Sequence, residues 1–244
     1  MTAAAAFRAL HHGREAGDPL VLPGPWDAVS ARAFADAGFP ALATPSAGVA
    51  AVLGYEDGGH TPPAAMFAAI ARIVRAVDVP VSADIEDGYG LAPAELVERL
   101  LEAGAAGCNL EDSDPATQQL KDPRLHADRL AEVRAAAGDR LVINARIDTF
   151  LRGTPDAGAA IERGRLYREA GADCVYPILA PSGLLPELAA GIGGPLNALA
   201  SPGGHPSPRE LGALGATRIT FGGGLQKRIA EDISRLAGEL AALS

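Results

Sequence analysis

The stretch V-P-V-S-A-D-I-E-D-G-Y-G, residues 79–90, passes from an apolar run into three acids and a Gly-x-Gly turn. The apolar run predicts a buried strand, and the glycines predict a turn after it. Asp84, Glu86 and Asp87 repel one another at this spacing, and a hard divalent cation such as Mg²⁺ would relieve that repulsion, because it prefers carboxylate, water and substrate oxygens. The alternative is a solvated acidic turn that caps the next helix.

A repeated strand–helix unit extends on both sides of this stretch. Helical segments that end in Ala-Gly or Leu-Gly precede short apolar runs, which suit parallel strands buried on both faces. Strands are predicted at residues 20–22, 41–44, 79–83, 107–110, 141–145, 174–178, 195–198 and 218–221. Helices are predicted at residues 28–37, 63–77, 93–103, 125–137, 157–170, 184–190, 208–214 and 225–243. This alternation predicts a single (β/α)8 barrel domain over residues 1–244, and a doubly wound open sheet is the alternative.

Composition excludes several classes of protein. With 21 basic and 30 acidic residues the formal charge is −9, which argues against a nucleic-acid partner. Arg8 interrupts the apolar N-terminus, and no apolar run approaches the length of a membrane span. Cys108 and Cys174 suit buried positions in a reducing compartment. We therefore expect a cytoplasmic protein without a membrane partner.

Acids and one arginine follow three consecutive predicted strands. Asp84 and Glu86 would point to the same side if the extended conformation persists, and Glu111 leaves the next strand at the same level. Together they suit Mg²⁺, while the planar guanidinium of Arg146 can hold a carboxylate or phosphonate bidentately. Metal and arginine together would stabilise an enolate. The alternative for Arg146 is a salt bridge to Asp148 or Glu111 that ties strands together.

Six motifs in order give the chain a resemblance to a known family. They are G-P-W-D-A-V-S-A-R (24–32), T-P-S-A-G (44–48), L-G-Y-E-D-G (53–58), A-D-I-E-D-G-Y-G (83–90), N-L-E-D-S (109–113) and N-A-R-I-D (144–148). The chain resembles the isocitrate lyase/phosphoenolpyruvate mutase superfamily, closest to its phosphoenolpyruvate mutase and phosphonopyruvate hydrolase-like branch. The resemblance implies a Mg²⁺-dependent barrel, with Mn²⁺ as an alternative ion, acting on small 2-oxo acids. It also implies a homo-oligomer, dimer or tetramer, with exchanged C-terminal helices.

The resemblance also implies roles for individual residues. Asp84 corresponds to a direct metal ligand, and Glu86 and Glu111 to acids that act largely through metal-bound water. Arg146 corresponds to the arginine that holds the anionic end of the substrate, and Asp57 to an acid near the metal. Implied substrate contacts lie in the first-strand loop and the second-strand loop, at Trp26, Ser46, Ala47 and Gly48.

The loop at residues 112–123, D-S-D-P-A-T-Q-Q-L-K-D-P, departs from part of the family. It lacks the cysteine of the Cys-Gly-His motif that serves as an acid in the lyases, so isocitrate cleavage by that route is not expected. It resembles more loosely the gating loop of the phosphonopyruvate branch, in which Gln118, Gln119 and Lys121 could contact a phosphoryl group. Asp87 stands where a threonine is frequent, and its role is open.

The expected function is that of a Mg²⁺-dependent isomerase or lyase. It would make or break a C–P or C–C bond beside the enolate of a small 2-oxo acid, such as phosphonopyruvate or an oxaloacetate-like substrate. Two alternatives remain: a metal-dependent pyruvate aldolase, and a catalytically silent barrel that binds an anionic metabolite.

Overall fold

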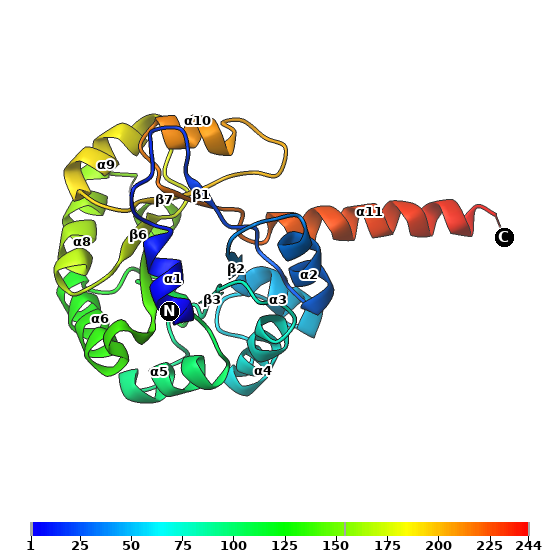
Figure 1. The fold of residues 1–244 in the computed structure, drawn as a ribbon, viewed down its shortest axis with the longest axis horizontal. Helices are drawn as coiled ribbons and strands as arrows, with labels where there is room; N and C mark the ends of the chain where they lie inside the picture. The colour runs from blue at the N-terminus through cyan, green and yellow to red at the C-terminus, as the bar shows by residue number, and fades with distance from the viewer. Residues whose placement is uncertain (1, 154, 244) are drawn as a thin grey trace.

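The eight parallel strands follow one another around a barrel (Figure 1). In the computed structural model, residues 2–153 and 155–243 are described. The strands within them are β1 (Leu20–Val21), β2 (Leu42–Thr44), β3 (Val81–Asp84), β4 (Gly107–Glu111), β5 (Val142–Ile147), β6 (Cys174–Pro177), β7 (Asn197–Leu199) and β8 (Arg218–Thr220). Two parallel sheets hold them, in the orders β2-β3-β4-β5-β6 and β1-β8-β7.

Backbone hydrogen bonds join the two sheets at both edges. The amide of Val175 donates to the carbonyl of Pro195 at 3.1 Å, which places β6 beside β7. The amide of Ala43 donates to the carbonyl of Pro23 at 3.1 Å, which places β2 beside the end of β1. The predicted (β/α)8 barrel is therefore confirmed, and the open sheet is wrong.

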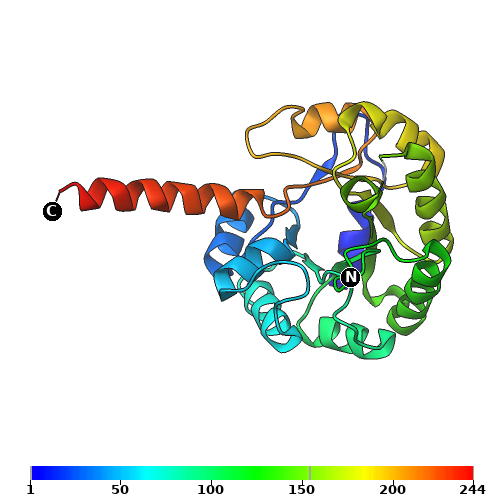
Figure 2. The ribbon, with the colours of Figure 1, turned by 180° about the vertical axis from the view of Figure 1, so that it is seen from behind.

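Helices cover the outside of the barrel, in the ring seen in Figures 1 and 2. The predicted ones are α2 (Ala28–Asp36), α4 (Pro63–Val74), α5 (Pro93–Glu102), α6 (Pro123–Ala137), α8 (Ala157–Glu169), α9 (Leu185–Ile192), α10 (Pro208–Ala213) and α11 (Gly224–Ala241). The sequence did not indicate α1 (Ala3–Ala9), α3 (Ser46–Leu53), α7 (Thr149–Arg152) or the short 3₁₀ turns η1 (Gly138–Arg140) and η2 (Ser182–Leu184). In the described ranges, no helix has both the length and the apolar character needed to cross a membrane.

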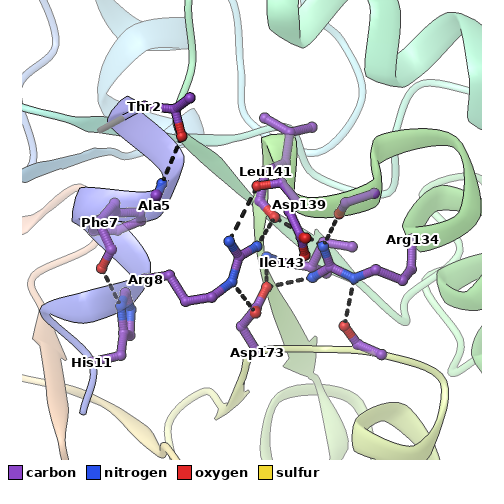
Figure 3. Close-up of polar contacts among 12 residues, drawn as sticks. Thr2, Ala5, Phe7, Arg8, His11, Arg134, Asp139, Leu141, Ile143 and Asp173 are labelled. Atoms are coloured by element: carbon purple, nitrogen blue, oxygen red, sulfur yellow. Dashed lines mark hydrogen bonds and ion pairs between the residues drawn. The ribbon is translucent and has the colours of Figure 1, made fainter. Parts of the chain in front are cut away.

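Helix α1 lies across the end of the barrel at which the strands begin. Phe7 is fully buried there, in a cluster with Leu20 and Leu22. Figure 3 shows the polar side of this contact: Asp173 accepts hydrogen bonds from Nε of Arg8 at 2.8 Å, from the amide of Ile143 at 2.8 Å, and from Arg134. We call Phe7, Arg8, His11, Arg134 and Asp173 the floor cluster.

Helix α11 projects away from the barrel (Figures 1 and 2). Its first turn lies near α3, since a side chain at Gly48 would come within 3.3 Å of Cβ of Gln226. No residue of α11 is buried. Ile229, Ile233, Leu236 and Leu240 are exposed on it, and their spacing puts them on one face of the helix.

Candidate active site

A cavity of about 210 Å³ opens at the end of the barrel where the strands finish. This is the end at which barrel enzymes of this fold place their active sites. The lining residues come from six strands or the segments after them, and from α7. They are Ala43, Thr44, Pro45, Ser46, Ala47, Asp57, Asp84, Asn109, Arg146, Leu151, Tyr176, Ile178, Thr220, Gly222 and Gly223.

Strand register explains why these side chains meet. Asp84 of β3 pairs with Asn109 of β4, and Arg146 of β5 pairs with Glu111 of β4 and Tyr176 of β6. Because alternate residues of a strand face the same side, Asn109 and Glu111 face the barrel interior together. Polar residues thus occupy the positions that face inward, and the residues between them pack against the helices.

Asp84 is the last residue of β3 and lines the cavity. Burial raises the pKa of its carboxyl group, and the neighbouring Asp57 raises it further, whereas Arg146 lowers it. One of its oxygens accepts a hydrogen bond from the amide of Glu86 at 3.2 Å. Asp84 is therefore a carboxylate that a cation in the cavity would stabilise.

Glu86 differs from the sequence expectation. The extended conformation does not persist beyond β3, because Glu86 adopts a left-handed backbone with φ 51°. The residue is 3% exposed, and neither carboxylate oxygen makes a hydrogen bond of normal geometry with the described protein atoms, although the amide of Gly59 and the hydroxyl of Tyr89 lie close enough to lower its pKa. Burial, with Asp57 and Asp84 nearby, raises its pKa to about 7. A buried acid without partners is costly unless a ligand satisfies it, so this residue marks the site.

Arg146 joins two acids while it lines the cavity. Its Nη1 lies 2.5 Å from a Glu111 oxygen, and its Nε and Nη2 donate to Asp148 at 2.7 and 3.1 Å. Burial alone would lower the pKa of Arg146, but Glu111 and Asp148 raise it. Burial raises the pKa of Glu111, against the lowering effect of Arg146. The salt bridges from Arg146 to Glu111 and Asp148, given above as the alternative role, are thus present. One N–H on each terminal nitrogen of Arg146 is still available for a ligand.

Ser46, Ala47 and Gly48 were expected in a loop, but they form the first turn of α3. Pro45 precedes this turn, and no side chain caps it. The first amide groups of a helix have no partner within the helix and attract anions. Because Ser46 and Ala47 line the same cavity as Asp84, the free amides of this helix start could bind an anion there.

Seven predicted residues do not line the cavity: Glu86, Glu111 and Gly48, which are close neighbours of lining residues, and Trp26, Gln118, Gln119 and Lys121. Lys121 binds Asp87, with 3.0 Å between Nζ and Oδ2. Gln118 and Gln119 are exposed, and Nε2 of Gln118 donates to the carbonyl of Pro115 at 2.8 Å. Trp26 packs against Phe34, with 6.3 Å between ring centroids. Roles for these residues in substrate binding stay predictions, and Asp87 gains a partner that the sequence did not reveal.

Sequence reasoning missed the uncharged part of the cavity lining. Asn109, Leu151, Tyr176, Ile178 and Thr220 were not proposed as site residues, although all line the cavity. One signal was present for Tyr176: it stands at the same alternating position in its strand as Arg146 does in the strand before. Candidates had been chosen by charge at the strand ends and by the roles that the family resemblance implies, and neither criterion indicated these five neutral residues.

The residues present fit a hard divalent cation. Among the described residues, no three His, Cys, Asp or Glu side chains converge closely enough to bind a metal by themselves. Mg²⁺ does not need such a cluster, because it takes one or two carboxylates and fills its other positions with water or substrate. Asp84 and Asp57 line the cavity, and Glu86 has two oxygens without partners.

A barrel with acids, an arginine and a helix start at the carboxyl ends of its strands belongs to the barrel enzymes that act on small anions. Residues 7–241 match the family described as phosphoenolpyruvate phosphomutase. The chain belongs to this family, within the isocitrate lyase/phosphoenolpyruvate mutase superfamily, so the predicted resemblance is confirmed. Members of the superfamily are divalent-metal-dependent lyases or mutases for small 2-oxo acids or phosphonates.

Individual relatives extend this result. The chain is 36% identical over 219 residues to an uncharacterised protein of Mycobacterium tuberculosis, covering 89% of this chain and 81% of that protein. It is 32% identical to the 2-methylisocitrate lyase of Bacillus subtilis, over 66% of this chain and 56% of the lyase. A proposed phosphonomutase from Burkholderia cenocepacia J2315, solved by crystallography, is 40% identical with a TM-score of 0.89, covering 96% of this chain and 98% of that one.

Proposed function

We propose that this chain is a Mg²⁺-dependent isomerase or lyase that makes or breaks a C–P or C–C bond beside the enolate of a small 2-oxo acid. The observation that carries the proposal is the cavity at the barrel end, where the acid Asp84, the cation Arg146 and the start of α3 meet. A 2-oxo acid chelated to a metal requires an acid that binds the cation, here Asp84, and groups that bind the anion, here Arg146 and the start of α3.

In this proposal Asp84 holds Mg²⁺ directly, and Glu86 and Glu111 act through bound water; Mn²⁺ is an alternative ion. The bound ion would supply the positive charge that stabilises an enolate. Glu86 suits a water-mediated role because its two oxygens make no hydrogen bond of normal geometry with the described protein atoms. Asp57 also lines the cavity and would bind a further water or a substrate hydroxyl.

Two groups of the chain would hold the substrate. The free N–H groups of Arg146 would grip an anionic oxygen, with Glu111 and Asp148 fixing the plane of the guanidinium. Backbone amides of Ser46 and Ala47, at the start of α3, would bind the carboxylate. The loop at residues 112–123 would exclude water: Asp112 is anchored by Arg163 at 2.9 Å and Tyr167 at 2.7 Å, so the loop has a fixed base.

The test is turnover of phosphonopyruvate, oxaloacetate and a 4-hydroxy-2-oxo acid, each with Mg²⁺ and with EDTA. We expect turnover of at least one of them, lost in EDTA and restored by Mg²⁺. Asp84→Asn should abolish it, and Asp18→Asn, a change at a side chain that is 76% exposed, is the matched control. Turnover that persists in Asp84→Asn contradicts the proposal.

The two alternatives have distinct outcomes in the same experiment. A metal-dependent pyruvate aldolase or 2-oxo acid lyase would release pyruvate and an aldehyde from the 4-hydroxy-2-oxo acid. A silent barrel would bind oxalate with Mg²⁺ and turn over none of the three acids. The second outcome would support the proposed binding site and contradict the proposed reaction.

We also propose that the chain forms a homo-oligomer, a dimer or tetramer, in the cytoplasm, with α11 exchanged between subunits. Ile233 and Leu236 are 62% and 55% exposed on a helix that projects from the barrel, and such a face is expected to be covered. Ile233→Asp should lower the molar mass measured by light scattering. Ser234→Asp, at an exposed residue of the same helix, adds the same charge and is the control.

A further inference from the structure

We propose that Arg163 and Tyr167, on the outer helix α8, are positioning residues for Arg146. They hold the carboxylate of Asp112, this carboxylate holds the backbone at Asp148, and Asp148 orients the guanidinium of Arg146. The inference rests on the proposed function, in which Arg146 binds an anionic oxygen of the substrate. Residues outside the cavity then decide how well the site binds its anion.

The link nearest the substrate is the carboxylate of Asp148. It is fully buried, and it accepts hydrogen bonds from Nε of Arg146 at 2.7 Å and from Nη2 at 3.1 Å. Two parallel hydrogen bonds between a carboxylate and a guanidinium fix the plane of the guanidinium. Glu111 contacts one further nitrogen of Arg146, at 2.5 Å, and a single contact does not fix the plane. The orientation of Arg146 therefore follows the position of Asp148.

The backbone at Asp148 lies beyond the strand that carries Arg146. Strand β5 ends at Ile147, and the last residue pair between β4 and β5 is Glu111 with Arg146. One residue after the end of β4, the buried carboxylate of Asp112 accepts a hydrogen bond from the amide of Asp148 at 2.8 Å. A side chain thus continues the connection between the two strand ends after the backbone pairing has stopped.

Helix α8 holds this carboxylate from the outside of the barrel. It lies in the outer ring of helices (Figure 1), and Arg163 and Tyr167 are about one turn apart on it. Nη1 of Arg163 donates to Oδ2 of Asp112 at 2.9 Å, and the hydroxyl of Tyr167 donates to the same oxygen at 2.7 Å. The described residues that line the cavity include Arg146 but neither of these two. A change at either residue therefore reaches Arg146 without removing a contact to the ligand.

Arg163 is expected to matter more than Tyr167, because it carries the charge that balances Asp112. The carboxylate of Asp112 is fully buried, and the side chain of Arg163 is 11% exposed. Removal of one partner of a buried ion pair leaves an uncompensated charge, so the region around Asp112 must rearrange. Nη2 of Arg163 also donates to the carbonyl of Lys121 at 2.9 Å, and the amide of Lys121 donates to the carbonyl of Asp112 at 2.8 Å. One guanidinium therefore holds both ends of the loop at residues 112–121.

Two other roles would use the same contacts and have to be separated from positioning. If the contacts only tie α8 to the barrel, substitutions at Arg163 and Tyr167 will lower stability and leave the affinity for an anion unchanged. If the contacts act through the loop at residues 112–121, a loss of affinity will not depend on Arg146.

The test measures oxalate binding in Mg²⁺ by calorimetry, and Mn²⁺ binding without oxalate by electron paramagnetic resonance. Arg163→Met should weaken oxalate binding about 10-fold and change Mn²⁺ binding by less than about 2-fold, because the network leads to Arg146 and not to Asp84. Tyr167→Phe should weaken oxalate binding about 3-fold. Arg163→Lys, which keeps the charge, should recover part of the affinity. Arg165→Met, at an exposed arginine of α8 whose Nε donates to the carbonyl of Gly191 at 2.6 Å, is the matched control and should bind oxalate as the wild type does.

A double-mutant cycle with Arg146 separates positioning from an effect of the loop. In an Arg146→Lys background the ammonium group has no plane to be oriented, so Arg163→Met should weaken oxalate binding by less than about 2-fold further. An equal loss in both backgrounds, or wild-type oxalate affinity in folded Arg163→Met and Tyr167→Phe, overturns the inference and leaves the proposed function. If Arg163→Met does not fold, Tyr167→Phe takes its place in the cycle, with the same outcomes. Absence of oxalate binding in the wild-type chain overturns both.

Discussion

The two ends of the barrel use the same kinds of side chain in opposite ways. At the floor cluster, Oδ1 of Asp173 binds Arg8, and Oδ2 binds Arg134 and the amide of Ile143, so this acid is fully satisfied. At the other end, neither oxygen of Glu86 has an ion pair or a hydrogen bond of normal geometry with the described protein atoms, although the residue is 3% exposed. This difference indicates that a buried acid whose oxygens are all paired stabilises the fold, whereas a buried acid whose oxygens are not paired is available to bind a ligand.

The two ends also differ in the number of arginines per acid, which is higher at the floor cluster. Two arginines, Arg8 and Arg134, share Asp173 at the floor. At the active-site end, two acids, Glu111 and Asp148, share Arg146, and Asp84 and Glu86 have no cation of their own. Changes at the floor should therefore act on stability, and changes at the other end on ligand binding and turnover.

The largest effect is expected at Asp84. Asp84→Asn removes a carboxylate whose pKa is raised by burial, so the free energy of unfolding should stay the same or rise. Turnover should fall roughly 10³-fold, and Mn²⁺ binding measured by electron paramagnetic resonance should weaken strongly. A large loss of stability in Asp84→Asn, with normal Mn²⁺ binding, would show that this residue stabilises the fold and does not bind the metal.

The next largest effect is expected at the floor. Asp173→Ala leaves Arg8, Arg134 and the amide of Ile143 without their acceptor, and should lower the free energy of unfolding by about 3 kcal/mol in urea denaturation. Turnover per folded molecule should not change. Asp18→Ala breaks the exposed pair with Arg14 and should cost less than about 0.5 kcal/mol. Equal effects of the two changes would contradict the role of the floor cluster.

A pH effect follows from His11, also at the floor. Burial lowers its pKa to about 3, and Arg218 lowers it further, against Phe7 and Asp173, which raise it. The unfolded chain then binds a proton that the folded chain does not between about pH 3 and 6.5. The contribution of His11 to stability is therefore complete above about pH 6.5, and falls by about 1.4 kcal/mol per pH unit below it.

Denaturation series between pH 5 and 8 would measure this slope. His11→Gln should reduce it by the contribution of one proton, while His12→Gln, at the exposed neighbouring residue, should leave it unchanged. Equal slopes in wild type and His11→Gln would show that the residue is not buried in its neutral form.

The smallest effect is expected at Lys121 and Asp87, which are paired with each other like the floor residues but lie at the active-site end. This is a saturated ion pair on the active-site side, at 3.0 Å. A double-mutant cycle of Lys121→Met and Asp87→Asn should give a coupling energy of about 1 kcal/mol, with faster proteolysis of residues 113–120 in each variant. If Lys121 binds substrate instead, Lys121→Met will raise KM far more than Asp87→Asn does.

The sequence by itself determined the alternation of strands and helices and the charged positions at the strand ends, but not the closure of the sheet into a barrel. Apolar runs alternate with amphipathic segments at regular spacing, and such local patterns specify strand and helix almost independently of the rest of the chain. Asp84, Glu111 and Arg146 each stand at a strand end, and parallel strands bring their carboxyl ends to one edge. Their proximity could therefore be predicted without a structure.

The tertiary structure alone decided how each of these side chains is engaged. The pairing of Lys121 with Asp87 and the meeting of Arg146 with Glu111 and Tyr176 depend on contacts between residues far apart in sequence. Helix α1 had too few residues for a periodic signal, and it is held by burial of Phe7 and by Arg8 on Asp173. Barrel closure sets all of these contacts at once, and no local pattern encodes them.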